Sequence, residues 1–148
     1  MTKEEFLQKA WAAARKASSV SGLPAVVTVA QAALESNWGQ SQLSRDANNY
    51  FGLKAHSSHA CVAMPTKECD DKGEHSTRAQ FALYGSMEEC FADRDRVINT
   101  CGVYAKAREC AADVHNFVNE MAKHWATDPD YAEKLIGLVK QVSDTERK

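Results

Sequence analysis

The sequence predicts a mainly helical α+β fold, in which a small β-hairpin lobe at about residues 57–84 is inserted between helices. Apolar residues recur at helical spacing on both sides of this lobe, whereas residues 59–84 show no helical period. The sequence DDKG at residues 70–73 is a turn between two extended segments. With 148 residues the chain is long enough for one hydrophobic core and too short for two, so we expect a single domain over residues 1–148.

The first predicted helix begins after Thr2, because Thr2 and Glu5 have the spacing of a capping box. Gly22 follows this helix and ends it. Its apolar face consists of Leu7, Trp11 and Ala14, which recur at helical spacing.

A strongly apolar segment at residues 24–34 is followed at once by a single carboxylate, Glu35. Apolar side chains cover most of the helical circumference there, so we expect a buried helix, with Pro24 in the first turn, where proline is tolerated. A carboxylate at the end of a buried helix loses hydration, which disfavours its charged form and raises its pKa. Glu35 is therefore the candidate general acid, able to donate a proton near neutral pH. The alternative is a helix-terminal carboxylate paired with a nearby Arg or Lys.

Three further helices are expected after the hairpin lobe. The sequence SMEE at residues 86–89 is a second capping box, and Gly102 ends the helix that it begins. Asp128 and Pro129 are expected to cap the last helix. The expected core positions of the three helices are Met87, Phe91 and Ile98, then Val114, Phe117, Val118 and Met121, and finally Leu135, Leu138 and Val142.

A polar and aromatic segment, NNYFGLK at residues 48–54, follows Glu35 at a short distance. Its amides can hydrogen-bond hydroxyl groups and its aromatic rings can stack on the C–H faces of sugars, so the segment predicts a carbohydrate site. Asn49, Tyr50 and Phe51 are the candidate substrate contacts. The alternative is a turn that enters a strand.

The composition argues against two classes of partner. The net charge is −2, with 18 basic and 20 acidic residues intermixed, so no basic field is available to hold nucleic acid. The longest apolar run, at residues 24–34, is far too short to span a bilayer. We therefore expect neither a nucleic-acid partner nor a membrane partner.

Three sequence blocks together resemble one known family. They are AQAALESNWG at residues 30–39, NYFGLK at residues 49–54 and ATDPDYAEKL at residues 126–135. In this order they are similar to glycoside hydrolase family 73, the peptidoglycan-cleaving N-acetylglucosaminidases that include the muramidase domain of the flagellar rod protein. The resemblance, which runs from about Phe6 to Val142, implies a lysozyme-like helical domain whose β-hairpin lobe flanks the active-site cleft. It further implies cleavage of peptidoglycan glycan strands at the β-1,4 bond between N-acetylglucosamine and N-acetylmuramic acid, with no cofactor.

The resemblance also implies a second catalytic group in the hairpin lobe, because glycoside hydrolysis usually needs two carboxylates. In the family this residue lies in a Thr-x-Glu sequence on the first strand, which residues 66–68 match, so Glu68 is the candidate. Cys69 stands where the family more often has an aromatic residue, and Pro65 is expected to interrupt the strand. The other nearby carboxylates belong to the predicted turn and are expected to be solvated: Asp70, Asp71 and Glu74.

Two tyrosines match tyrosines of the family, Tyr104 and Tyr131. A phenol near the anomeric carbon can orient water or stabilise an oxocarbenium-like state. Each tyrosine is equally well explained as a half-buried side chain with a bonded hydroxyl. Trp38 is a candidate platform on which a sugar ring stacks, but we favour the alternative that Trp38 is a core residue that desolvates Glu35.

The chain has five cysteines, an odd number, so at least one thiol stays free in a monomer, the state that we expect. Cys61 and Cys69 would lie about 26 Å apart on a single strand and could not form a disulfide with each other. No metal site is expected, because no closed Cys/His pattern is formed by the spacing of His56, His59, Cys61, Cys69 and His75.

Two other functions stay open as alternatives. A lytic transglycosylase would use Glu35 for both proton steps and would not need Glu68. A non-catalytic module would only bind glycan, and an intact acid within an intact motif argues against it.

The expected substrate lies outside the cytoplasmic membrane, yet the chain begins directly in a helix and not with the charged and apolar lead of a secretory signal. We therefore expect a bacteriolytic enzyme that is made in the cytoplasm without a signal peptide and acts in the periplasm or cell wall after delivery. Phage release through a membrane hole, injection into a rival bacterium and excision from a longer exported protein are three routes. Injection would require a protein inhibitor in the producer, aimed at the cleft where Glu35 and Glu68 should face each other.

Overall fold

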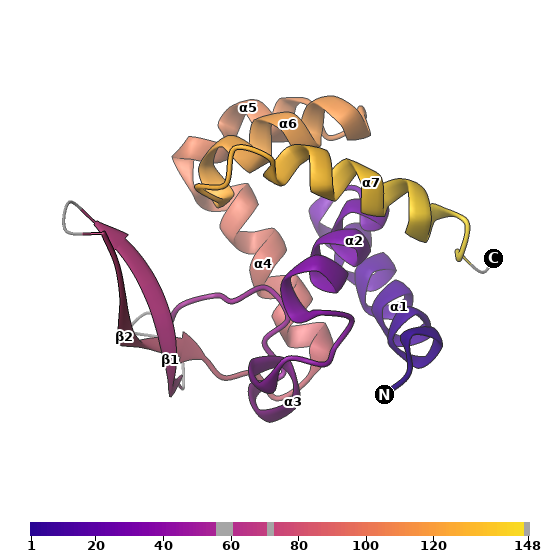
Figure 1. Cartoon of the computed structure of the whole chain (residues 1–148). Helices are drawn as coiled ribbons and strands as arrows, with labels where there is room; N and C mark the ends of the chain where they lie inside the picture. Colours follow the sequence, from indigo (N-terminus) through magenta and orange to yellow (C-terminus); the bar gives the residue numbers. More distant parts are fainter. Residues whose placement is uncertain (56–60, 71–72, 147–148) are drawn as a thin grey trace.

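The computed structural model describes residues 1–55, 61–70 and 73–146, of which residues 61–70 and 73–79 are described by their backbone alone. Helices form most of it, and a two-stranded hairpin extends to one side of the helical body (Figure 1). The elements are α1 (Lys3–Ser21), α2 (Ala25–Ser36), α3 (Gln42–Ala47), β1 (Cys61–Asp70), β2 (Gly73–Ala82), α4 (Met87–Thr100), the 3-10 helix η1 (Gly102–Tyr104), α5 (Ala105–Glu109), α6 (Val114–Trp125) and α7 (Tyr131–Ser143). The predicted mainly helical α+β fold with a small hairpin lobe is confirmed.

The helix α1 begins at the predicted capping box. Thr2 Oγ1 accepts a hydrogen bond from the backbone amide of Glu5 at 3.0 Å, and the Glu5 carboxylate accepts one from the amide of Thr2 at 3.3 Å. Gly22 ends the helix with a φ of +78°, a left-handed conformation that glycine adopts at no steric cost.

The helix α2 packs against both α1 and α7 (Figure 1), and most of its side chains are buried. Contact with two helices explains why apolar residues cover so much of its circumference. Pro24 stands at its N-cap, and the helix runs to Ser36. Glu35 therefore lies in the last turn of α2, at the end of a buried helix, as the sequence predicts.

The hairpin is antiparallel, with Cys61 opposite Ala82 at one end and Asp70 opposite Gly73 at the other. The turn is thus where the DDKG sequence predicts it, although residues 71 and 72 themselves lie outside the described part of the chain. Pro65 does not interrupt β1, as the sequence suggested it would. Each strand of a two-stranded sheet is an edge strand, where proline is tolerated.

The base of the hairpin is attached to the loop that follows α3. The amide of Ala55 donates to the carbonyl of Gln80 at 2.8 Å, and the amide of Ala82 donates to the carbonyl of Leu53 at 2.9 Å. The hairpin lobe is therefore connected to the helical body by backbone hydrogen bonds at residues 53–55 as well as by the chain itself.

The N-caps of the helices after the hairpin agree with the expectation at α4 and differ from it at α7. Ser86 caps α4 as predicted, since its hydroxyl accepts from the amide of Glu89 at 3.1 Å. The N-cap position of α7 is Asp130, not Asp128. The Asp128 carboxylate instead accepts from the amide of Asp130 at 2.9 Å and from Nζ of Lys134 at 2.7 Å.

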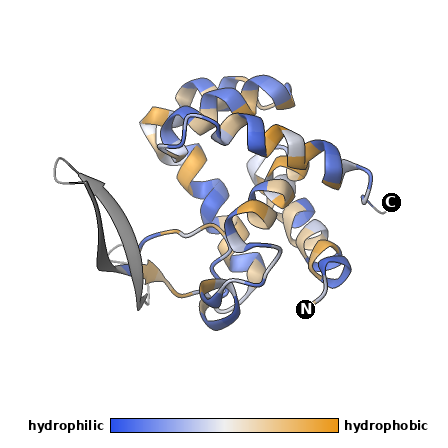
Figure 2. Ribbon diagram, viewed as in Figure 1, coloured by the Kyte–Doolittle hydropathy of each residue, from blue (hydrophilic) through white to orange (hydrophobic). Residues whose placement is uncertain are grey.

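Three short helices, α3, η1 and α5, were not predicted, because the longest of them has six residues and is too short to show a periodic pattern. Hydrophobic and hydrophilic residues alternate along the helices (Figure 2), as expected when each helix buries one face. The largest fully buried apolar side chains are Phe6, Leu23, Phe91, Ile98, Phe117, Met121 and Leu135. Leu7, Val114 and Leu138 are half-buried at the edge of the core and not inside it. Among the described residues, no helix is both long and apolar enough to cross a membrane.

Candidate active site

The candidate acid, Glu35, remains exposed at the surface of the last turn of α2. The surrounding protein nevertheless desolvates its carboxyl group and raises the pKa of Glu35. A hydrogen bond from the hydroxyl of Tyr131 to Oε1, 2.8 Å long, acts in the opposite direction on this pKa and is the smaller effect. The net effect shifts the carboxyl group towards its protonated form at a position that solvent and substrate can reach, which is what a general acid requires.

Tyr131, the first residue of α7, is buried, with 5% of its surface exposed. Its burial, followed by the charge of the nearby Glu35, raises the pKa of Tyr131 well above its ordinary value. The phenol therefore stays protonated and acts as a donor to Glu35. Its oxygen in turn accepts a hydrogen bond from Nε2 of Gln31 at 3.1 Å. Of the two family tyrosines, the structure brings this one to the candidate acid.

Behind Tyr131 a buried polar chain crosses the helical body. Nε of the wholly buried Arg94 donates to Oε1 of Gln31 at 2.9 Å. Nη1 of Arg94 donates to Thr28 Oγ1 at 2.9 Å and to Asp95 Oδ1 at 2.8 Å. The chain links Glu35 through α7 and α2 to α4, so the site is built from elements that are distant in sequence.

This polar chain was not predicted, although one signal for it is present in the sequence. Thr28, Gln31 and Glu35 follow each other at spacings of three and four residues in an otherwise apolar helix. Such spacing places the three side chains on one face of α2. Polar side chains within a buried helix need buried hydrogen-bond partners, and Arg94 of α4 is the partner of Thr28 and Gln31.

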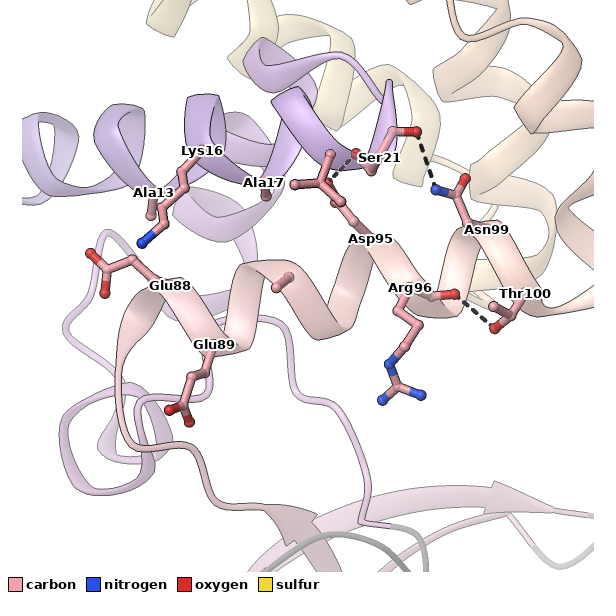
Figure 3. A pocket seen from close by; sticks show the side chains of 12 residues that line it. Ala13, Lys16, Ala17, Ser21, Glu88, Glu89, Asp95, Arg96, Asn99 and Thr100 are labelled. Atoms are coloured by element: carbon pink, nitrogen blue, oxygen red, sulfur yellow. Dashed lines mark hydrogen bonds between the residues drawn. The ribbon is translucent and has the colours of Figure 1, made fainter.

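A groove of about 550 Å³ lies between α1 and α4, at the far end of the polar chain (Figure 3). Ser21 and Asp95 line it, and the Ser21 hydroxyl donates to Asp95 Oδ2 at 2.7 Å. Its lining contains none of the residues predicted for the active site. The groove is therefore separate from the carboxyl group of Glu35.

The three candidate substrate contacts in the segment at residues 48–54 are buried, and the rest of the segment is half-buried or exposed. Asn49 is buried, and its amide group donates to the carbonyls of Leu53 and Ala82 at 2.8 and 3.0 Å. Tyr50 and Phe51 are also buried, and both pack against the ring of Phe91. Asn49 thus fixes the loop against the end of β2, and the two rings fix it against α4. Direct contact of the three side chains with substrate stays a prediction.

Two other predicted aromatic contacts also pack within the protein. Trp38 is half-buried beside α1, with its ring edge-on to Phe6 at 6.2 Å and Nζ of Lys3 at 4.8 Å from the ring centre. Tyr104 is buried, with its ring near those of His124 and Trp125. Burial raises the pKa of Tyr104. Within the described part of the chain, the hydrogen bond to Glu35 comes from Tyr131 and from neither of these residues.

The second predicted carboxylate, Glu68, lies on β1, with its backbone opposite His75 on β2. Its side chain lies outside the described residues, as do those of the neighbouring carboxylates. The same holds for the cysteines and histidines of the hairpin region. Asp70 lies on β1 and Glu74 on β2, not in the turn to which the sequence assigned them, and Asp71 lies outside the described residues. Cys90, Cys101 and Cys110 are free thiols, and burial raises the pKa of Cys90 to about 12.

A glycoside hydrolase needs an accessible carboxyl group of this kind to protonate the departing glycosidic oxygen. The family model described as mannosyl-glycoprotein endo-beta-N-acetylglucosaminidase matches residues 11–144. The chain thus belongs to the glucosaminidase family, glycoside hydrolase family 73, as the sequence blocks predicted.

The relatives agree with this assignment. The peptidoglycan hydrolase FlgJ of Salmonella typhimurium is 33% identical over 145 residues, which are 94% of this chain and 46% of that protein. The exo-glucosaminidase LytG of Bacillus subtilis is 32% identical over 120 residues, 78% of this chain and 43% of that protein. The catalytic domain of the autolysin Auto from Listeria monocytogenes has the same fold, with a TM-score of 0.85 and 32% identity, covering 97% of this chain and 86% of that one. The chain spans less than half the length of the two curated relatives.

Proposed function

We propose that this enzyme hydrolyses peptidoglycan at the β-1,4 bond between N-acetylglucosamine and N-acetylmuramic acid, with Glu35 as the general acid. The observation that carries the proposal is the pairing of an accessible carboxyl group of raised pKa with a buried, protonated Tyr131. The names of two relatives, a peptidoglycan hydrolase and an exo-glucosaminidase, support the substrate class.

In this mechanism protonated Glu35 donates its proton to the glycosidic oxygen as the bond to the anomeric carbon breaks. The carboxylate that remains accepts the hydrogen bond from Tyr131, which stabilises its new charge. Because the hydroxyl is already in place, no reorganisation is needed when the charge develops.

Glu68 is the proposed second carboxylate, acting as a nucleophile or as a base for water. Its place on the first strand of the hairpin lobe supports this role. A lytic transglycosylase is the competing mechanism, in which the muramyl 6-hydroxyl attacks and Glu68 is not needed. Mass spectrometry of digested sacculi separates the two, since only the transglycosylase produces 1,6-anhydro ends.

The direct test of the proposed acid is Glu35→Gln. The amide is nearly isosteric and can still accept from Tyr131, but it cannot donate the proton, so we expect a loss of about 10²–10⁴-fold in the rate of peptidoglycan clearance. Glu133→Gln, the same substitution on the exposed surface of α7, is the matched control and should keep wild-type activity. Near wild-type clearance by folded Glu35→Gln would exclude Glu35 as the acid.

We further propose a bacteriolytic role, in which the enzyme reaches the periplasm or cell wall by an external delivery route. A protein inhibitor that covers Glu35 would protect a producing cell. Expression in a Gram-negative host with and without an added secretion signal tests this role. Toxicity should require the signal and disappear with Glu35→Gln, and toxicity of the cytoplasmic form would contradict the proposal.

A further inference from the structure

We propose that Gln31 and Arg94 are positioning residues that fix the direction of the hydrogen bond from Tyr131 to Glu35, and thereby select the carboxyl oxygen that delivers the proton. This inference rests on the proposed function of Glu35 as the general acid. It follows from the donor and acceptor chemistry of four consecutive side chains.

The direction is set at Arg94. A guanidinium group has five N–H donors, no acceptor, and a charge that it does not lose in proteins. Because Nε of Arg94 lies 2.9 Å from one end of the Gln31 amide, that end must be the oxygen. The opposite orientation of the Gln31 amide would place its NH₂ group against the N–H of Arg94, which is also a donor. Arg94 therefore determines which end of the amide is the oxygen and which is the nitrogen.

The nitrogen of the Gln31 amide must then face Tyr131. Nε2 lies 3.1 Å from the tyrosine oxygen and 3.8 Å from Sδ of Met121, a weak acceptor, so both of its N–H groups have acceptors. The tyrosine hydroxyl has a single proton. Since its oxygen already accepts from Gln31, that proton is directed to Oε1 of Glu35, 2.8 Å away.

The direction of these hydrogen bonds determines which oxygen of the Glu35 carboxyl group carries the proton. With Oε1 occupied by a donor, the acid proton of the carboxyl group resides on Oε2. Oε2 has no hydrogen-bond partner among the residues that the structure describes. The chain from Arg94 therefore selects Oε2 as the oxygen that faces the glycosidic bond and leaves Oε1 bound to Tyr131 before and after proton transfer.

Burial keeps this direction fixed. Gln31 and Arg94 have no exposed surface, so bulk water does not compete for their hydrogen bonds. Thr28 and Asp95 hold Nη1 of Arg94 in place, and Asp95 balances its charge. Among the described residues, the ionisable groups around the chain are Arg94, Asp95 and Cys90 of α4, Glu35 of α2, Tyr131 of α7 and Tyr104 of η1.

Two substitutions at position 31 separate positioning from stability. Gln31→Glu keeps the side-chain shape and an acceptor for Arg94. It also presents a second acceptor to Tyr131, so the tyrosine hydroxyl donates its hydrogen bond to residue 31 and not to Glu35. We expect a stable protein whose maximal rate falls by about tenfold or more, as for loss of a hydrogen bond to a charged group. Gln31→Met offers the Tyr131 hydroxyl no competing acceptor, so the hydrogen bond from Tyr131 to Glu35 is kept. We expect a lower melting temperature, because Arg94 loses a partner, with a rate loss of about threefold or less.

A merely structural role predicts the reverse order, in which the more stable variant is also the more active one. Rates are compared at the pH optimum of each variant, because an added charge shifts the pH profile without lowering its maximum. In a Tyr131→Phe background, Gln31→Glu should cause no further loss, since the hydroxyl through which it acts is gone.

Three results would overturn the proposal: a wild-type maximal rate for Gln31→Glu, a Gln31→Met enzyme as slow as Tyr131→Phe, or losses that multiply in the double variant. The second result is decisive even if Gln31→Glu does not fold. Glu35→Gln, measured beside them, separates the two proposals. Activity of that variant removes the proposed function, whereas its inactivity together with fully active Gln31→Glu removes only the positioning role.

Discussion

The hydroxyl of Tyr131 donates a hydrogen bond of 2.8 Å to Oε1 of Glu35, although the two residues are 96 positions apart in the chain. The tyrosine is buried at the start of α7, whereas the carboxyl group remains exposed in the last turn of α2. The buried hydroxyl of Tyr131 thus fixes the position of the accessible carboxyl group of Glu35. The packing of α2 against α7 is therefore what assembles this part of the site.

Replacement of this tyrosine by phenylalanine should affect both rate and pH dependence. Tyr131→Phe removes the donor that stabilises the Glu35 carboxylate, so we expect a loss of about 10–100-fold in rate. The same hydrogen bond lowers the pKa of Glu35, so its loss raises that pKa further. Because the acid must be protonated to act, the alkaline limb of the kcat/KM profile should move to higher pH. A profile that moves to lower pH would contradict the assignment of Glu35.

The second carboxylate is tested by Glu68→Gln. If Glu68 is the nucleophile or base, we expect clearance of peptidoglycan to fall by about 10²-fold or more. Glu74→Gln, in the strand opposite, is the matched control and should retain activity. Robust hydrolysis by Glu68→Gln with 1,6-anhydro products would favour a transglycosylase, and without them a mechanism in which the N-acetyl group of the substrate assists.

The role of Asn49 separates two explanations of the segment at residues 48–54. In the structure its side chain satisfies the backbone of Leu53 and Ala82, so Asn49→Ala should destabilise the protein by about 2 kcal/mol because buried polar groups lose their partners. We expect KM to stay unchanged at temperatures where the variant is folded. A raised KM at unchanged stability would instead support the predicted sugar contact.

The sequence predicts much of this fold because local patterns are strong. Capping boxes at Thr2 and Ser86, the apolar face of α2 and the turn before Gly73 each indicate an element that the structure contains. The short helix α3 has too few residues for a periodic pattern. Glu35 and Ser36 continue α2 although they carry no apolar signal, so periodicity alone does not locate its last residue.

The site was predicted less completely, for a physical reason. Glu35 stands out in sequence because a carboxylate beside an apolar helix is unusual, and Tyr131 matches a family motif. Asn49 and Phe51 also match a motif, but a motif does not distinguish a sugar contact from a buried residue that shapes the loop. Arg94 lies in an ordinary polar helix sequence, and its burial depends on how α4 packs, which is a tertiary property.

The buried ion pair of Arg94 with Asp95 should be important for stability. Among the described residues, Arg94→Met leaves the buried Asp95 carboxylate with the Ser21 hydroxyl as its one remaining partner, so we expect a loss of about 3 kcal/mol in the free energy of unfolding. Urea denaturation measures it. Replacing both residues, with Asp95→Leu added, should recover part of the loss, because the unpaired charge is removed. A single variant as stable as the wild type would show that this pair contributes little.

Glu35→Gln should stabilise the protein at neutral pH while it removes activity. The pKa of Glu35 is raised above its ordinary value of 4.5 in the folded state, so the folded protein holds this proton more tightly than the unfolded chain does. Wild-type stability therefore contains a favourable contribution below pH 4.5 that is lost as the pH rises through the raised pKa. Glutamine stays neutral throughout and should not show this loss. Urea denaturation of both proteins should give equal stabilities in acid and a more stable variant at neutral pH, and a variant less stable at neutral pH would contradict desolvation as the cause of the raised pKa.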